Sequence, residues 1–203
     1  MELLPLTQLG GIDMKKICNC LIIILVAVGI ICGIVSAGNK TRHVVINDYA
    51  ACTDLKQMHE RAQFIVEGYF MPSTGTWNMA RDDFDTSKES QKYYTEGLLY
   101  PFNVESVFKG SVPDTITIIQ RHTDNYSGKT TVDDNYFDID FYKKYIVFLY
   151  YNEEFDHYYA GFVPWAIKVE NEVVYLEGVN EKSIIEDTIT GNNYQAVLNV
   201  ICP

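Results

Sequence analysis

The sequence has little of what metal centres and covalent catalysis need. Its 203 residues include only 5 cysteines and 4 histidines. Neither a C-x-x-C nor an H-E-x-x-H spacing is present to ligate zinc, and there is no G-x-S-x-G motif to present a serine nucleophile. We therefore predict no catalytic residue, no metal site and no cofactor for this chain.

Positive charge is also scarce. Lysine and arginine together number 16, against 27 aspartates and glutamates, which gives a formal net charge of -11. A surface of this sign repels the phosphates of nucleic acids and anionic lipid head groups. The charge balance therefore argues against nucleic acid as a partner. It is compatible with cationic partners, but most soluble acidic domains use such charge only for solubility.

The long hydrophobic run lies near the start of the sequence. Lys15 and Lys16 precede an uncharged apolar stretch over 17–35, and this order is read by the export machinery. The small residues up to Ala37 predict cleavage after that residue, with Met14 as the start of the signal. The run is also close to the roughly 20 residues that span a bilayer, which predicts a retained anchor instead. Both outcomes stay open.

The chain accordingly divides into a signal or membrane-anchor segment at 1–37 and an exported domain at 38–203. We expect the domain outside the cytoplasmic membrane, either held at the cell membrane or secreted after cleavage. It contains two cysteines, Cys52 and Cys202, one toward each end of the domain. In an oxidising compartment such a pair predicts a disulfide that joins the two ends.

Short β-branched and aromatic segments dominate the exported domain. A helix is expected over 54–62 with Thr53 as its N-cap, and a second helical period covers 194–201. Gly68 marks a position in the first strand where a bulge is tolerated. Strands are expected at 62–70, 100–108, 115–121, 144–151 and 158–163, followed by a hairpin over 166–176 with Asn171 at its tip. Five or six short strands with brief helices favour a small antiparallel barrel or sandwich.

The segments "AQFIVEGYF", "VESVFKG" and "YKKYIVFLYY" follow one another in an order that resembles a widespread group of exported bacterial domains. Those domains carry A-D-x-I-V-x-G-x-V, then V-x-K-G, then G-x-x-Y-x-x-F-L, and are similar to the OB-fold barrel in the form shared with tissue inhibitors of metalloproteinases. The resemblance covers about 53–176. Matching positions are Ala62, Ile65, Val66, Gly68, Val107, Lys109, Gly110, Tyr145, Phe148 and Leu149. Departures are Gln63, Phe70, and Phe141 or Tyr142 where a glycine is usual.

This resemblance implies a mainly β fold. It would be a small antiparallel OB-like barrel of five or six strands with short flanking helices, preceded by one N-terminal hydrophobic helix. The matching positions are scaffold residues, so they imply little about function. The inhibitors use a mature N-terminal cysteine against a protease's zinc. Here cleavage would leave Gly38 first and Cys52 internal, so that mechanism does not transfer.

Two polar inserts, 71–92 and 123–140, exceed the usual hairpin loop of two to five residues and are expected to be surface loops that bind a ligand. Four carboxylates lie in 133–140, but this segment lacks the glycine and terminal glutamate of a helix-loop-helix calcium loop. A second acidic cluster, 153–156, lies beside aromatic rings that suit a cationic ligand. The candidate ligand-contacting residues are Trp77, Asp133, Asp138, Glu153 and Asp156.

These features predict a non-enzymatic, exported or membrane-anchored domain that binds a protein or envelope ligand through its long loops. The membrane itself is a partner if the N-terminal segment is retained. The alternative is an extracytoplasmic hydrolase that uses loop carboxylates such as Asp133, Asp138, Glu153 or Asp156. A third interpretation, a purely structural domain, differs from the first only in lacking a dissociable partner.

Overall fold

The computed structural model describes residues 49–126, 128–178, 189 and 191–202. These residues belong to the second of two compact units, Arg42–Pro203, and the predicted signal or anchor at 1–37 lies outside them. Within these ranges no helix is both long and apolar enough to cross a membrane. The described part of the chain is mainly β with two short α-helices, which confirms the predicted fold class at that level.

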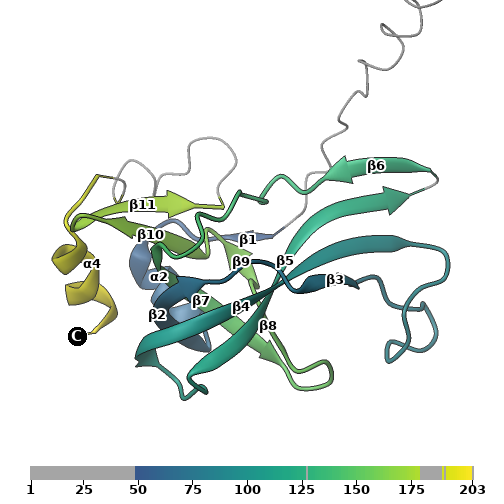
Figure 1. Cartoon of the computed structure of the whole chain (residues 1–203), viewed down its shortest axis with the longest axis horizontal. Helices are drawn as coiled ribbons and strands as arrows, with labels where there is room; N and C mark the ends of the chain where they lie inside the picture. Colours follow the sequence, from purple (N-terminus) through teal and green to yellow (C-terminus); the bar gives the residue numbers. More distant parts are fainter. Residues whose placement is uncertain (1–48, 127, 179–188, 190, 203) are drawn as a thin grey trace, which may run out of the picture. The chain divides into compact units, whose positions relative to one another are not determined.

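Nine strands form one sheet. They are β2 (Phe64–Phe70), β3 (Gly75–Asn78), β4 (Tyr94–Lys109), β5 (Thr115–Tyr126), β6 (Lys129–Val132), β7 (Lys144–Asn152), β8 (His157–Tyr159), β10 (Ala166–Glu170) and β11 (Val173–Glu177). The main path is β11-β10-β7-β2-β4-β5-β6, with β3 paired to β4 (Figure 1). β8 pairs in parallel with β5 and antiparallel with β7. The pairings therefore follow a closed path through β7, β2, β4, β5 and β8.

A second, two-stranded sheet consists of β1 (Ala50–Ala51) and β9 (Phe162–Val163), which pair in parallel. The backbone N–H of Cys52 continues this pairing by donating to the carbonyl of Val163 at 2.8 Å. The segment that enters the domain is thus fixed against the chain that follows β8. This pairing places Tyr49 next to the site described below.

The core lies on both faces of β2 and β7. One face carries a cluster that includes residues of α2 (Leu55–Arg61) and α4 (Tyr194–Ile201), and the other faces the remaining strands. Neighbouring residues alternate between the clusters, so that Ile146 and Phe148 join the helical side and Val147 joins the other. Because both faces are buried, β7 is a continuous apolar run rather than an alternating one.

The two helices predicted within the exported domain are confirmed, with one correction at a cap. The N-cap of α2 is Asp54, whose Oδ1 accepts a hydrogen bond from the Gln57 amide at 2.8 Å, and not Thr53 as the sequence suggested. Either side chain suits an N-cap, so composition alone did not separate them. The C-terminal helix has the bounds that its periodicity predicted, and Asn193 caps it by accepting from the Gln195 amide.

The other predicted strands are present, but the one expected at 158–163 is divided into β8 and β9, which belong to different sheets. The strand count of five or six is also too low. The hairpin turn at Asn171 is confirmed, with positive φ at Asn171 and Glu172. The first insert, 71–92, contains β3, and the second, 123–140, contains β6 and the end of β5. Both inserts are therefore partly sheet rather than open loop. Their polar side chains concealed the strands because one face of this region meets solvent.

The predicted disulfide between Cys52 and Cys202 does not form in the structure, where both residues are free. Cys52 is 3% exposed and packs in the cluster beneath α2, and burial raises the pKa of its thiol. Cys202 follows the last turn of α4 and is exposed. One thiol therefore faces the core and the other faces solvent.

Candidate functional site

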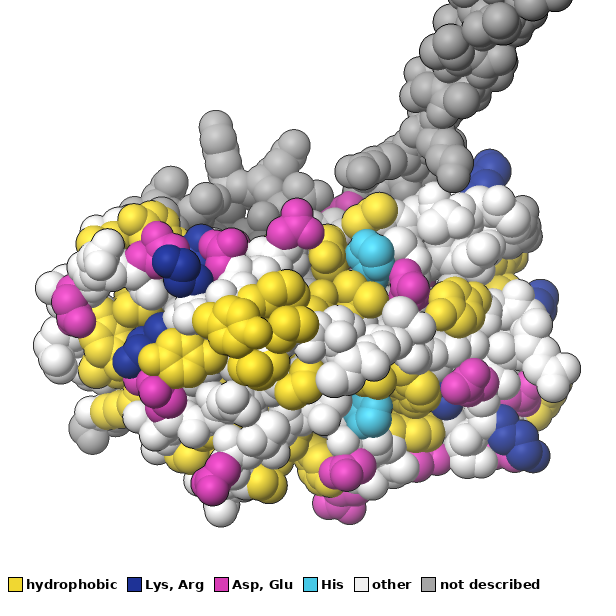
Figure 2. All heavy atoms as spheres, viewed as in Figure 1, with side chains coloured by type: hydrophobic (Ala, Val, Ile, Leu, Met, Phe, Trp, Pro, Cys, Tyr) yellow, Lys and Arg dark blue, Asp and Glu magenta, His cyan; other side chains and the backbone are white. Residues whose placement is uncertain are grey.

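Two adjoining cavities lie along β5, with volumes of about 330 Å³ and about 260 Å³. They share Met79, Ile119 and Tyr159 as walls, and we call them together the β5 groove. On the face drawn in Figure 2, hydrophobic side chains gather in separate patches with polar and acidic side chains between them. Such a surface suits a bounded ligand site better than a broad apolar interface.

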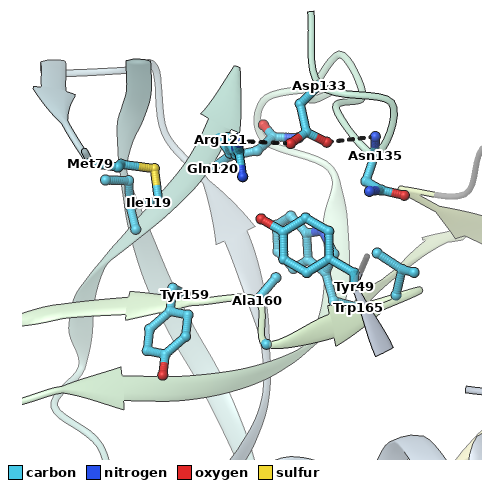
Figure 3. A pocket seen from close by; sticks show the side chains of 12 residues that line it. Tyr49, Met79, Ile119, Gln120, Arg121, Asp133, Asn135, Tyr159, Ala160 and Trp165 are labelled. Carbon is cyan, nitrogen blue, oxygen red and sulfur yellow. Dashed lines mark hydrogen bonds and ion pairs between the residues drawn. The ribbon is translucent and has the colours of Figure 1, made fainter. Parts of the chain in front are cut away.

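An ion-pair cluster forms the polar end of the larger cavity. Arg121 Nη2 lies 2.5 Å from Asp124 Oδ2, and Arg121 Nε lies 3.2 Å from Asp133 Oδ2 (Figure 3). The Asp133 side chain is only 1% exposed, and its Oδ1 accepts from the Asn135 amide at 2.8 Å. One guanidinium therefore joins the strand β5 to the segment that follows β6.

Tyr49, the residue before β1, lines the same cavity as this ion-pair cluster. In Figure 3 its hydroxyl points toward Gln120 and Arg121. Burial, together with the charge of Asp133, raises the pKa of the Tyr49 hydroxyl. Burial disfavours the charge of Arg121, but hydrogen bonding to Asp124 and the nearby acidic groups outweigh it and raise the pKa of the guanidinium. The Arg121 guanidinium is therefore positively charged at neutral pH.

Gln120 presents a buried acceptor at the larger cavity. The residue is 4% exposed, and its Nε2 donates to the carbonyl of Phe137 at 3.1 Å, which fixes the orientation of the amide. Its Oε1 is buried and has no hydrogen-bond partner among the described residues. Leaving a buried acceptor unpaired costs about 1–3 kcal/mol. An N–H or O–H donor placed next to this oxygen would satisfy it.

The smaller cavity has an aromatic wall. Trp77 lies 4.9 Å from Phe155 and 5.1 Å from His157 between ring centroids, and the guanidinium carbon of Arg81 lies 4.2 Å from the Trp77 centroid and 4.6 Å from that of Phe155. His157 Nδ1 is buried without a partner in the described part of the chain. This end of the groove therefore combines ring faces with an unpaired ring nitrogen.

The structure brings together two of the five predicted contact residues and leaves three outside the groove. Trp77 lines the smaller cavity and Asp133 the larger one. Asp138 is exposed and accepts from the Tyr136 hydroxyl at 3.2 Å. Glu153 and Asp156 are exposed in the turn between β7 and β8, where Asp156 accepts from the Tyr151 hydroxyl at 2.7 Å. No cluster of three or more metal-ligating side chains exists among the described residues.

Sequence reasoning missed Gln120 and Arg121, which carry the polar chemistry of the groove. Both lie at the end of the apolar segment 115–121, where the sequence indicated only a strand end. Arg121 is a lone basic residue before an acidic insert. This contrast in charge is the sequence feature that could have identified it as a site residue. Nothing in the spacing identifies Met79 or Tyr159, because the pairing of strands brings them together.

We expect Arg121→Gln to lower the free energy of unfolding by about 2 kcal/mol, because it leaves two largely buried carboxylates without this cation. The effect is smaller than for a fully buried pair because 26% of the Arg121 side chain is exposed. Denaturant unfolding would measure it, and the loss should shrink in an Asp133→Asn background. Equal losses in both backgrounds would contradict the coupling of Arg121 to Asp133.

Comparisons with protein-family models, with curated proteins and with solved structures found no match to this chain. The resemblance to OB-like barrels of the metalloproteinase-inhibitor type therefore stays a prediction. The residues of the β5 groove and the sequence that precedes the domain are the features that bear on its function.

Proposed function

We propose that this chain is a non-enzymatic binding domain that acts outside the cytoplasmic membrane and holds a protein or envelope ligand in the β5 groove. The observation that carries the proposal is Oε1 of Gln120, a buried acceptor with no hydrogen-bond partner among the described residues, beside a cavity whose walls come from both predicted inserts. Ligand sites combine apolar walls with a few fixed polar groups. Ile119 and Tyr159 supply such walls beside Gln120.

The proposal includes an OB-like barrel as the scaffold. The closed path of pairings through β7, β2, β4, β5 and β8 is what closing a sheet into a barrel requires. A closed sheet presents its ligand sites at the ends and loops of its strands. The groove, built where β5 and β8 meet the inserts, agrees with that arrangement.

The proposed location rests on the order of Lys15, Lys16 and the apolar run over 17–35. A retained run would hold the domain at the outer face of the membrane, and cleavage after Ala37 would release it. The acidic charge of the chain supports a protein or neutral envelope ligand over nucleic acid.

Binding is favoured over the alternative of hydrolysis by the contacts of the carboxylates. Hydrolysis by paired carboxylates needs two of them facing one bond. Asp133 is instead engaged by Arg121, and Asp156 by the hydroxyl of Tyr151. Such contacts are typical of carboxylates that stabilise the fold rather than of carboxylates that act in catalysis.

Photo-crosslinking on intact cells tests the proposal. A diazirine amino acid replaces Met79 in the groove, and the matched control replaces Phe84, which lies in the same insert and is 99% exposed. We expect a discrete adduct from position 79, at least about tenfold more than from position 84. Adding Gln120→Met, which removes the acceptor at similar volume, should reduce the adduct. Equal adducts from both positions, or no effect of Gln120→Met, would contradict binding in the groove.

A further inference from the structure

A second, separate site is formed where β4, β5 and β6 pair. The register places Thr95 opposite Asp124 and Asp124 opposite Thr131, so these three side chains form one row on one face of the sheet. Tyr126 lies two residues beyond Asp124 and pairs with Lys129, which puts both on the same face in the next row. This face therefore carries a polar row beside a row that contains an exposed tyrosine.

Tyr93 extends the second row by stacking on Tyr126. The ring centroids are 5.3 Å apart and the planes differ by 10°, and the Lys92 ammonium lies 4.6 Å from the Tyr93 centroid. Tyr93 is held in place because its amide donates to Ser90 Oγ at 3.1 Å and its carbonyl accepts from Asn78 Nδ2 at 3.4 Å. Tyr126 is the open member of the pair, with 61% of its surface exposed.

A cavity of about 590 Å³ lies against this face. None of its nine described lining residues is aliphatic: three are tyrosines, and the others carry hydrogen-bonding side chains. The charges of Arg121 and Asp124 are paired with each other at 2.5 Å, whereas Asn125 and Lys129 are exposed at the rim. We call this set of residues, centred on Tyr93 and Tyr126, the tyrosine platform.

This composition selects a particular ligand chemistry. A partner's aliphatic side chain offers no hydrogen-bonding group to the hydroxyls and ammonium that line this cavity. A polyhydroxylated ring has one face of C–H groups, which suits the electron-rich face of tyrosine, and a periphery of hydroxyls that hydrogen-bond with ammonium and hydroxyl groups. The acidic net charge of the chain disfavours phosphorylated rings.

We propose that the tyrosine platform binds a neutral sugar ring of a glycan, with Tyr126 as the stacking surface and Lys129, which lies on the same face, as a hydrogen-bonding partner of the sugar hydroxyls. The platform is a cavity of its own that shares only Arg121 with the larger cavity of the β5 groove in the described chain. The proposal does not rest on binding in the groove, and it stands or falls independently.

Calorimetric titration of the full chain with neutral tetrasaccharides of glucose, N-acetylglucosamine, mannose and galactose tests this proposal. We expect at least one to bind with a Kd below about 1 mM, and Tyr126→Ala to weaken it at least about tenfold. Tyr126→Phe keeps the ring and should stay within about threefold of the parent. The matched control is Tyr142→Ala, which alters another tyrosine that is 63% exposed but does not line the cavity, and it should leave the affinity unchanged.

Three results would overturn the sugar-ring proposal. The first is no binding of any tetrasaccharide at about 10 mM. The second is an affinity unaffected by Tyr126→Ala while Gln120→Met abolishes it, which would place the sugar in the β5 groove. The third is binding of a nucleoside such as uridine at the platform, with the same dependence on Tyr126, in place of the sugars.

Discussion

Replacing Gly68 by alanine is expected to destabilise the domain by more than about 3 kcal/mol. A Cβ atom on Gly68 would lie 1.9 Å from the carbonyl oxygen of Asn103 and 2.8 Å from Cε1 of Phe102. The carbonyl is backbone in β4, and Gly68 is flanked on its other side by Tyr145 of β7. Because both neighbours are paired core strands, neither can move away without breaking the ladder that holds β2 at the centre of the sheet.

Gly75→Ala is the matched control for this prediction. Gly75 also lies in a strand, β3, but nothing lies within 4 Å of the position its Cβ would take. Its substitution should change the free energy of unfolding by no more than about 0.5 kcal/mol. Denaturant unfolding of the full chain measures both. A loss below about 1 kcal/mol at Gly68 would show that β2 and β4 do not approach as closely as described.

Local sequence patterns predicted the structure correctly where those patterns come from buried side chains. At Gly68, where the sequence tolerates a bulge, the register shifts between Glu67 and Gly68. The apolar run of β7 is buried on both faces, and the period of α4 fits a helix whose Val197 and Ile201 are buried. In each case the pattern comes from the same side chains that form the core.

The ends of the long strands could not be predicted in this way. β4 begins at Tyr94 and β5 ends at Tyr126, within polar sequence where apolar alternation fails. Those residues are strand because each backbone finds a partner, β3 on one side and β6 on the other. Pairing depends on register between distant segments, which a single sequence does not encode locally.

The candidate sites could be predicted only in part from the sequence, for the same reason. Trp77 and Asp133 were proposed because they lie in polar inserts, and the structure places them in adjoining cavities. Gln120 looked like part of an ordinary strand end, and its importance arises from an amide held by a carbonyl of the second insert. The tyrosine platform likewise exists through the register of three strands. A site that forms through the pairing of strands can be identified only when that pairing is known.

The second large effect is expected for Phe70→Ala, with a loss of about 3–5 kcal/mol in the free energy of unfolding. Phe70 is fully buried at the end of β2. Its ring meets four others edge to face, at centroid distances of 6.1 Å for Tyr100, 4.8 Å for Phe102, 5.1 Å for Tyr145 and 6.4 Å for Trp165. Truncation leaves a void that four large rings cannot close without losing their own contacts.

The same substitution should also disturb the β5 groove, because Trp165 is 2% exposed and forms part of the wall of the larger cavity. The chain has 2 tryptophans, so in a Trp77→Phe background the emission reports Trp165 alone. We expect Phe70→Ala to shift that emission to longer wavelength as water reaches the indole. Phe84→Ala, at a ring 99% exposed, should change neither stability nor emission. If Phe70→Ala lost stability with no shift in emission, the wall of the groove would be independent of the aromatic core.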